Sequence, residues 1–426
     1  MKKLVLFTIA FLFPAMIAGQ SVDSFNEFRQ SMLNNYSSFK TETMNNYNSF
    51  RDSINHRYAK NIEKEWEERD INQSKTIPEF DRKPITPVIR ENDAEDTIVS
   101  VEFTPTILPP TPIIVEQPMP YIPIEKDKSI IESEKFSFSY YGTQMVVSKP
   151  IQFNFALKGL DNQSISNAWI NLSECVSEQM LNDCLNIRTK HQLCDWAYLN
   201  MLGCLSERCC GGKSNKSVLL QSYLFSQSGY KIRLARSSDK LYLLFASKHT
   251  IYNLSYYEIE GEVYYPLDCD ESSLHICQAS YPQEESLSLI INKEQLLGGD
   301  SFKSITLSTD NKFHSTAIIN KDLLNFYSSY PTSSYDDNIM TRWAMYANTP
   351  LSKRTSDSLY EQLKSKVENL TDVKAVQYLL TFVQLTFEYK TDDDVWGEDR
   401  AFFSEETLYY PYADCEDRSI VFTRQM

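Results

Sequence analysis

The chain has 426 residues, with 57 acidic and 42 basic side chains and a formal net charge of −15. This acidic balance excludes the basic patches by which proteins bind nucleic acids or anionic membrane surfaces. The 26 Tyr and 23 Phe supply ample apolar surface for hydrophobic cores, and the length suits two or three domains.

Residues 1–19 have the pattern of a secretory signal peptide. A basic start at Lys2 and Lys3 precedes an apolar run and a small-residue exit at Ala18 and Gly19. The apolar run is too short to span a bilayer stably, and no cysteine near the exit offers lipid attachment. We therefore expect an exported protein, periplasmic or secreted, with no membrane anchor.

Residues 20–72 contain a helical repeat with a period of eleven. One column of the repeat is aromatic at Phe25, Tyr36, Tyr47 and Tyr58. Eleven residues make about three helical turns, so this column forms one stripe along a nearly straight helix. The stripe fits a helix docked on its own globular domain and fits equally a spacer or a helix that self-associates.

Residues 73–130 are rich in proline, with ten of the seventeen prolines lying between Pro78 and Pro123. Proline denies helix and favours an extended, semi-rigid chain. We interpret this segment as a linker, and a proline-rich ligand for a partner is the alternative.

The remaining chain predicts an α+β protein. Residues 131–284 combine a hairpin around Gly142, helical periodicity over residues 164–202 and strands within residues 228–247 and 256–268. Residues 285–345 are predicted to be β-rich, with strands from Leu287 to Ile319. Helices are expected again at Ser356–Asn369 and Asp372–Tyr389, within a last region at 346–426.

Eight of the nine cysteines lie between Cys175 and Cys277, and the ninth is Cys415. In an exported protein this pattern predicts disulfides among the eight, between different elements. Zinc is the alternative for one cluster, but its spacings are irregular for that metal. The cluster comprises His191, Cys194, Cys204, Cys209 and Cys210.

Two further motifs are weak. Gly211–Ser214 looks like the end of a phosphate-binding loop, but Glu207 stands where the first glycine is required. The acidic stretch from Lys390 to Arg400 could invite calcium, but it lacks the ligand spacing and central glycine of an EF-hand. We interpret it as a solvated loop, and the sequence predicts no cofactor and no metal site.

Cys415 stands at the predicted start of a helix. Asp414 occupies the N-cap position, and Asp417 follows three residues later. The helix N-terminus favours a thiolate, whereas the carboxylates of Asp414, Glu416 and Asp417 disfavour it. From the residues alone, a nucleophile that requires a histidine partner and an inert structural thiol both remain open.

The segment from Val376 to Phe422 resembles the start of a transglutaminase-like (papain-like) cysteine domain. Glu405, Glu406, Thr407 and Leu408 match the family's "P-x-E-T-L" approach to the nucleophile. Asp414, Cys415, Asp417 and Ser419 match its "G-D-C-x-D-x-A" turn, with Ala413 in place of the glycine. The wider chain resembles exported Bacteroidetes proteins that carry this domain behind a helical, proline-linked region.

The resemblance implies acyl transfer or amide hydrolysis through a Cys–His–Asp triad, on a protein or cell-wall peptide substrate. The family's His and Asp follow the cysteine, whereas His56, His191, His249, His275 and His314 all precede Cys415. Cys415 is therefore the one catalytic residue carried over. We expect the chain to be truncated before its His and Asp and to be inactive, and a non-catalytic periplasmic binding or scaffold protein is the alternative.

The middle region has a short internal parallel to the Cys415 turn. "NKSVLLQ" at 215–221 matches "DRSIVFT" at 417–423, with Lys213 in the position of Cys415. We expect residues from Phe136 to about Asp268 to hold a degenerate copy of the domain without a nucleophile. Chance similarity between two amphipathic helices is the alternative.

Overall fold

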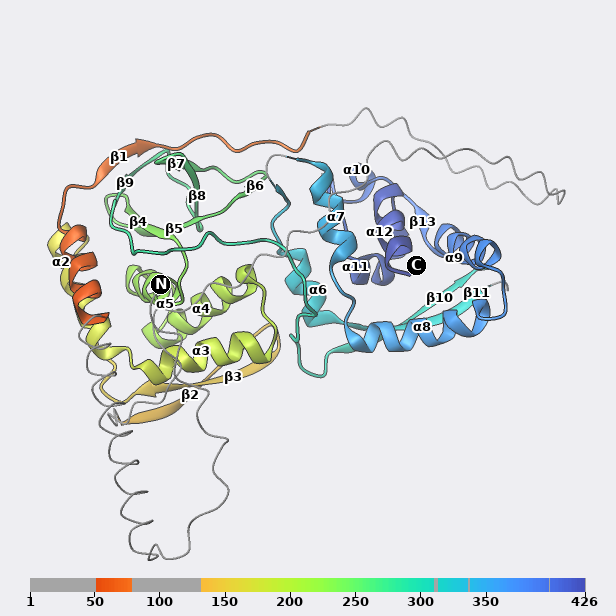
Figure 1. Cartoon of the computed structure of the whole chain (residues 1–426), viewed down its shortest axis with the longest axis horizontal. Coiled ribbons are helices and arrows are strands. Elements are labelled where there is room, and N and C mark those ends of the chain that lie inside the picture. The colour runs from red at the N-terminus through yellow and green to blue at the C-terminus, as the bar shows by residue number, and fades with distance from the viewer. Residues whose placement is uncertain (1–50, 79–131, 310–312, 336–337, 398, 426) are drawn as a thin grey trace, which may run out of the picture. The chain divides into compact units, whose positions relative to one another are not determined.

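The computed structural model describes residues 51–78, 132–309, 313–335, 338–397 and 399–425 (Figure 1). The chain divides into two units, residues 1–54 and residues 55–426, and the second unit contains the elements from β1 to α12. This unit is of mixed α+β class, as predicted. The predicted signal peptide, most of the predicted eleven-residue repeat and most of the predicted proline-rich linker lie outside the described residues. Within them, every helix is too short or too polar to cross a membrane.

A six-stranded antiparallel sheet forms the centre of the middle region. Its strand order is β1-β9-β4-β5-β8-β7. The central strand β5 (Leu241–Ala246) is buried along its whole length because apolar side chains cover both of its faces. The other strands are β1 (Glu67–Asp70), β9 (Ser273–Ile276), β4 (Ile232–Arg236), β8 (Glu262–Pro266) and β7 (Tyr257–Ile259).

Four helices and a hairpin accompany this sheet, and the helical periodicity over residues 164–202 predicts the first three of the helices. Two of the helices have an N-cap side chain that accepts a hydrogen bond from a backbone N–H of the first turn. Asp161 caps α2 in this way, and Ser177 caps α3. The α5 helix packs on β5, and α3 packs on the hairpin. These elements are α2 (Asn162–Cys175), α3 (Glu178–Lys190), α4 (Asp195–Cys210), α5 (Asn215–Gln227), β2 (Ser133–Tyr140) and β3 (Thr143–Pro150).

The last turns of the repeat helix dock on the middle region. Residues 55–62 are helical. The Tyr58 ring stacks on Tyr281 at 4.2 Å between centroids and lies 4.7 Å from the Trp169 ring. Asn55 Oδ1 accepts a hydrogen bond from the Tyr281 hydroxyl at 2.7 Å. For this part of the repeat, the docked-helix interpretation is the one the structure favours.

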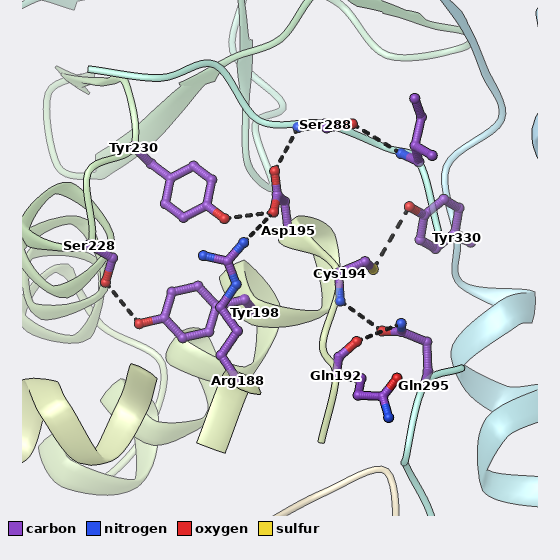
Figure 2. Close-up of polar contacts among 11 residues, drawn as sticks. Arg188, Gln192, Cys194, Asp195, Tyr198, Ser228, Tyr230, Ser288, Gln295 and Tyr330 are labelled. Atoms are coloured by element: carbon purple, nitrogen blue, oxygen red, sulfur yellow. Dashed lines mark hydrogen bonds and ion pairs between the residues drawn. The ribbon is translucent and has the colours of Figure 1, made fainter. Parts of the chain in front are cut away.

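A buried polar network joins the start of α4 to residues 286–297 (Figure 2). Asp195 accepts hydrogen bonds from Arg188 at 2.6 Å, from the Tyr230 hydroxyl at 2.7 Å and from Ser288 N at 3.0 Å. Next to it, Cys194 N donates to Gln295 Oε1 at 2.8 Å. Residues 286–297 form no regular strand and so lack a ladder of backbone hydrogen bonds. The hydrogen bonds of Asp195 and Gln295 instead hold this segment against α4.

The predicted β-rich region therefore begins later than expected. Its hairpin consists of β10 (Phe302–Thr309) and β11 (Phe313–Asn320), and α6 (Lys321–Ser328) follows directly. A short ladder also pairs β6 (His249–Ile251) with β12 (Ser333–Tyr335).

The hairpin shares one hydrophobic core with the C-terminal helices. Leu307 and Ile319 belong to the same buried cluster as Leu359, Phe382 and Val421. The helices are α7 (Met340–Asn348), α8 (Lys353–Val367), α9 (Asp372–Thr386), α10 (Asp392–Val395), α11 (Ser404–Tyr409) and α12 (Cys415–Gln425). Residues 302–320 thus pack with the region predicted at 346–426.

Candidate functional site

Cys415 is the first residue of α12, as predicted, and its thiol is exposed. The other eight cysteines, all within the described residues, are buried or half-buried. Cys415 Sγ lies 3.9 Å from the Tyr389 hydroxyl. The helix therefore presents one accessible sulfur atom beside a phenol.

The side chains of Asp414 and Asp417, predicted to cap α12, hold the start of this helix in place. Asp414 Oδ1 accepts a hydrogen bond from Asp417 N at 3.2 Å, which is N-cap geometry. Asp417 Oδ1 in turn accepts from Phe402 N at 2.7 Å. The two-residue strands β13 (Glu388–Tyr389) and β14 (Tyr412–Ala413) pair in parallel just before the helix. These contacts place the Cys415 turn against the preceding loops.

The carboxylates around Cys415 repel one another. Burial, followed by contact with Glu416 and the charge of Asp417, raises the pKa of Asp414 to about 10. Burial also raises the pKa of Asp417 well above its usual range, and the charges of Asp392 and Glu416 add to the rise. These two carboxyls therefore bind protons more tightly than ordinary aspartates and oppose a thiolate less than their sequence suggests.

The interpretation of residues 390–400 as a solvated loop is wrong for two of its carboxylates. Asp392 is 5 % exposed, and its Oδ2 accepts from Arg400 N at 2.8 Å. Asp399 binds the fully buried guanidinium of Arg342 at 2.8 Å. The short helix α10 turns Asp392 inward, while Asp393 and its neighbour remain exposed. The spacing of the carboxylates does not indicate this arrangement. Asp399 finds its partner Arg342 in α7, and Asp392 meets the Arg400 N–H only because the chain turns back after α10.

None of the five histidines supplies a base for Cys415. In the described part of the chain, which includes all five, no histidine ring lies within hydrogen-bonding distance of the sulfur. Burial lowers the pKa of His249 to about 3, and its Nε2 accepts from Leu289 N. His191 Nδ1 bonds to Leu296 O at 3.0 Å. The remaining three lie in the repeat helix, β9 and β11: His56, His275 and His314.

The residues that match the family approach motif are buried in the core. Thr407 and Leu408 are at most 1 % exposed. Glu405 Oε1 accepts from Ser352 N at 2.5 Å. Glu406 accepts from Phe403 N and pairs with Arg400 at 2.6 Å. These side chains position α11 behind the Cys415 turn and do not reach the sulfur.

Glu405 makes stability depend on pH. Burial raises its pKa to about 7, so the folded chain binds a proton between the unfolded value near 4.5 and pH 7. Its contribution to stability, about 3 kcal/mol, is complete below pH 4.5 and is lost as the pH rises through 7. We expect Glu405→Gln to flatten the fall in the free energy of unfolding between pH 5 and about 8, measured by urea titration. The exposed Glu361→Gln is the control, and an unchanged slope in Glu405→Gln would contradict the assignment.

The predicted disulfides are absent. All nine cysteines are free thiols, and all nine lie in described residues. Burial raises the pKa of Cys194 and Cys209 to about 12, which disfavours the thiolate form of both. The alternative zinc cluster is not assembled either, since among the described residues the one group with metal-ligand spacing is acidic.

The Gly211–Ser214 motif forms the end of α4 and the start of α5. Gly211 has a φ of +79° and ends α4, and Ser214 caps α5. Lys213, predicted to occupy the cysteine position of a degenerate copy, forms an exposed ion pair with Asp268 at 2.8 Å. It lies two residues before α5 begins, whereas Cys415 is the first residue of α12. The strands β4, β5 and β8 that follow α5 pair in antiparallel fashion.

Comparison of this chain with known proteins finds no relative. The chain matches no protein-family model, no curated protein and no solved structure. The class of protein therefore has to be argued from the site itself.

Proposed function

We propose that Cys415 is the nucleophile of an exported, transglutaminase-like cysteine domain. Its chemistry would be acyl transfer or amide hydrolysis on a protein or cell-wall peptide. The observation that supports this most strongly is the exposed thiol on the first residue of a capped helix whose opposite face is buried through Ile420 and Val421. Backbone N–H groups at such a helix start stabilise negative charge on the sulfur.

The first chemical step needs little more than this thiol when the leaving group is good. The sulfur attacks the acyl carbon, an S–C bond forms, and the bond to the leaving group breaks. A nitrophenolate departs as a stable anion, whereas an amide nitrogen must receive a proton. With no histidine beside Cys415, the chain is expected to accept an acyl group from an activated ester and to leave amides intact.

The order of elements in the middle region supports a related architecture there. Helix α5 is followed by the antiparallel strands β4, β5 and β8, and Lys213 binds Asp268 beside the helix start. An ion pair at this place substitutes for a nucleophile and its partner, which is consistent with a degenerate copy.

The test is the intact mass of the full chain after incubation with a p-nitrophenyl ester. We expect one acyl group, mapped to Cys415 and released by hydroxylamine as thioesters are. Cys415→Ser should abolish it, whereas Cys209→Ser, at a half-buried thiol, should leave it unchanged. Acylation spread over several thiols would contradict the proposal and favour a binding or scaffold protein. Amide turnover that Cys415→Ala abolishes would contradict the absence of a base.

A further inference from the structure

Three carboxylates beside Cys415 come together from three separate segments. Asp392 begins α10, Asp399 lies in the following loop, and Glu416 lies in the first turn of α12. One oxygen from each lies within 4.8 Å of the other two. A calcium ion holds carboxylate oxygens at about 2.3–2.6 Å and so spans oxygen pairs up to roughly 5 Å apart. Magnesium, at about 2.0–2.1 Å, demands near-ideal octahedral geometry and tolerates less spread among its ligands.

Asp417 is an independent indication that this place takes a ligand. The residue is 1 % exposed, and its Oδ1 is held by Phe402 N. Its Oδ2 is buried and accepts no hydrogen bond from the described residues. Asp417 directly follows Glu416 in the first turn of α12, and the charges of Asp392 and Glu416 act on its carboxyl. A buried carboxylate oxygen without a donor is costly, and a cation beside it removes that cost.

The arginines nearby do not balance the charge. Arg342 donates to both oxygens of Asp399, and Arg418 directs one nitrogen to Phe387 O. Arg400 forms an ion pair with Glu406. Two arginines therefore remain for the three carboxylates of Asp392, Asp399 and Glu416, which leaves this group negatively charged.

We propose that Asp392, Asp399 and Glu416 bind one calcium ion, with Asp417 completing the site directly or through a water molecule. Arg342 orients Asp399, whose oxygens retain lone pairs for the metal. The ion connects α10 and the loop after it to the first turn of α12. The proposal stands whether or not Cys415 is a nucleophile.

The experiment is a titration of the full chain, stripped with a chelator, with calcium chloride alone. Isothermal calorimetry should show one ion bound, and the melting temperature should rise with calcium more than with magnesium. We expect Asp392→Asn and Glu416→Gln each to weaken calcium binding about tenfold or more. Asp393→Asn, exposed on the same helix, is the control and should bind as the parent chain does.

Loss of folding does not confuse this result. Removing one of several crowded carboxylates relieves repulsion, so both variants should melt without calcium at or above the temperature of the parent chain. A folded variant that no longer responds to calcium then identifies a lost ligand. No heat and no melting shift at millimolar calcium, or an undiminished response in both variants, would overturn the proposal.

Discussion

Replacing Asp195 with alanine is expected to lower the free energy of unfolding by about 3–5 kcal/mol. The carboxylate lies against Arg188, whose side chain is 3 % exposed, and it also binds Tyr230 and Ser288 N. Alanine leaves the guanidinium charge buried without its partner and leaves two further donors unpaired. The loss should also loosen residues 286–297, since Asp195 is one of the groups that hold them (Figure 2).

The matched control is a second aspartate that pairs with a cation at the surface. Asp270 binds Lys240 at 3.3 Å, and its side chain is 75 % exposed. Asp270→Ala should therefore leave the free energy of unfolding almost unchanged. Urea unfolding of both variants measures the difference, and equal losses would show that the buried network is not what ties the segment down.

Replacing Tyr58 with alanine is expected to cost about 3–5 kcal/mol, because a fully buried ring is removed from between Trp169 and Tyr281. The resulting cavity lies where the repeat helix docks. We expect residues 55–62 to become sensitive to limited proteolysis in this variant, as an undocked helix of this length is only marginally stable.

Tyr58→Phe separates the ring from its hydroxyl. The Tyr58 hydroxyl is buried and has no hydrogen-bond partner among the described residues. Removing it should leave stability unchanged or raise it by about 1 kcal/mol. A large loss in Tyr58→Phe, or none in Tyr58→Ala, would contradict the docking described here.

Much of the fold could be predicted because its signals are local. The hairpin around Gly142, the three helices from Asn162 to Cys210 and the capped start of α12 follow from periodicity and capping residues. The segment from residue 286 to 297 could not be predicted in this way. Its place is set by side chains such as Asp195, more than ninety residues earlier.

The site was predictable in part for the same reason. The position of Cys415 follows from Asp414 and Asp417, which are its neighbours in sequence. The approach of Asp392 and Asp399 to Glu416 depends on tertiary packing, so the acidic stretch resembles a solvated loop. The disulfide prediction was wrong because it relied on the expected compartment, whereas tertiary packing leaves all nine cysteines as free thiols.

The central claim is that the fold makes Cys415 a nucleophile. The most direct test is the rate at which an activated ester acylates Cys415 in the folded chain, compared with the same cysteine in urea-unfolded chain at equal pH. The position of Cys415 at the positive end of the α12 dipole predicts acylation about tenfold or more faster in the folded chain. A folded rate equal to or below the unfolded rate would identify Cys415 as a structural thiol and contradict the proposed function.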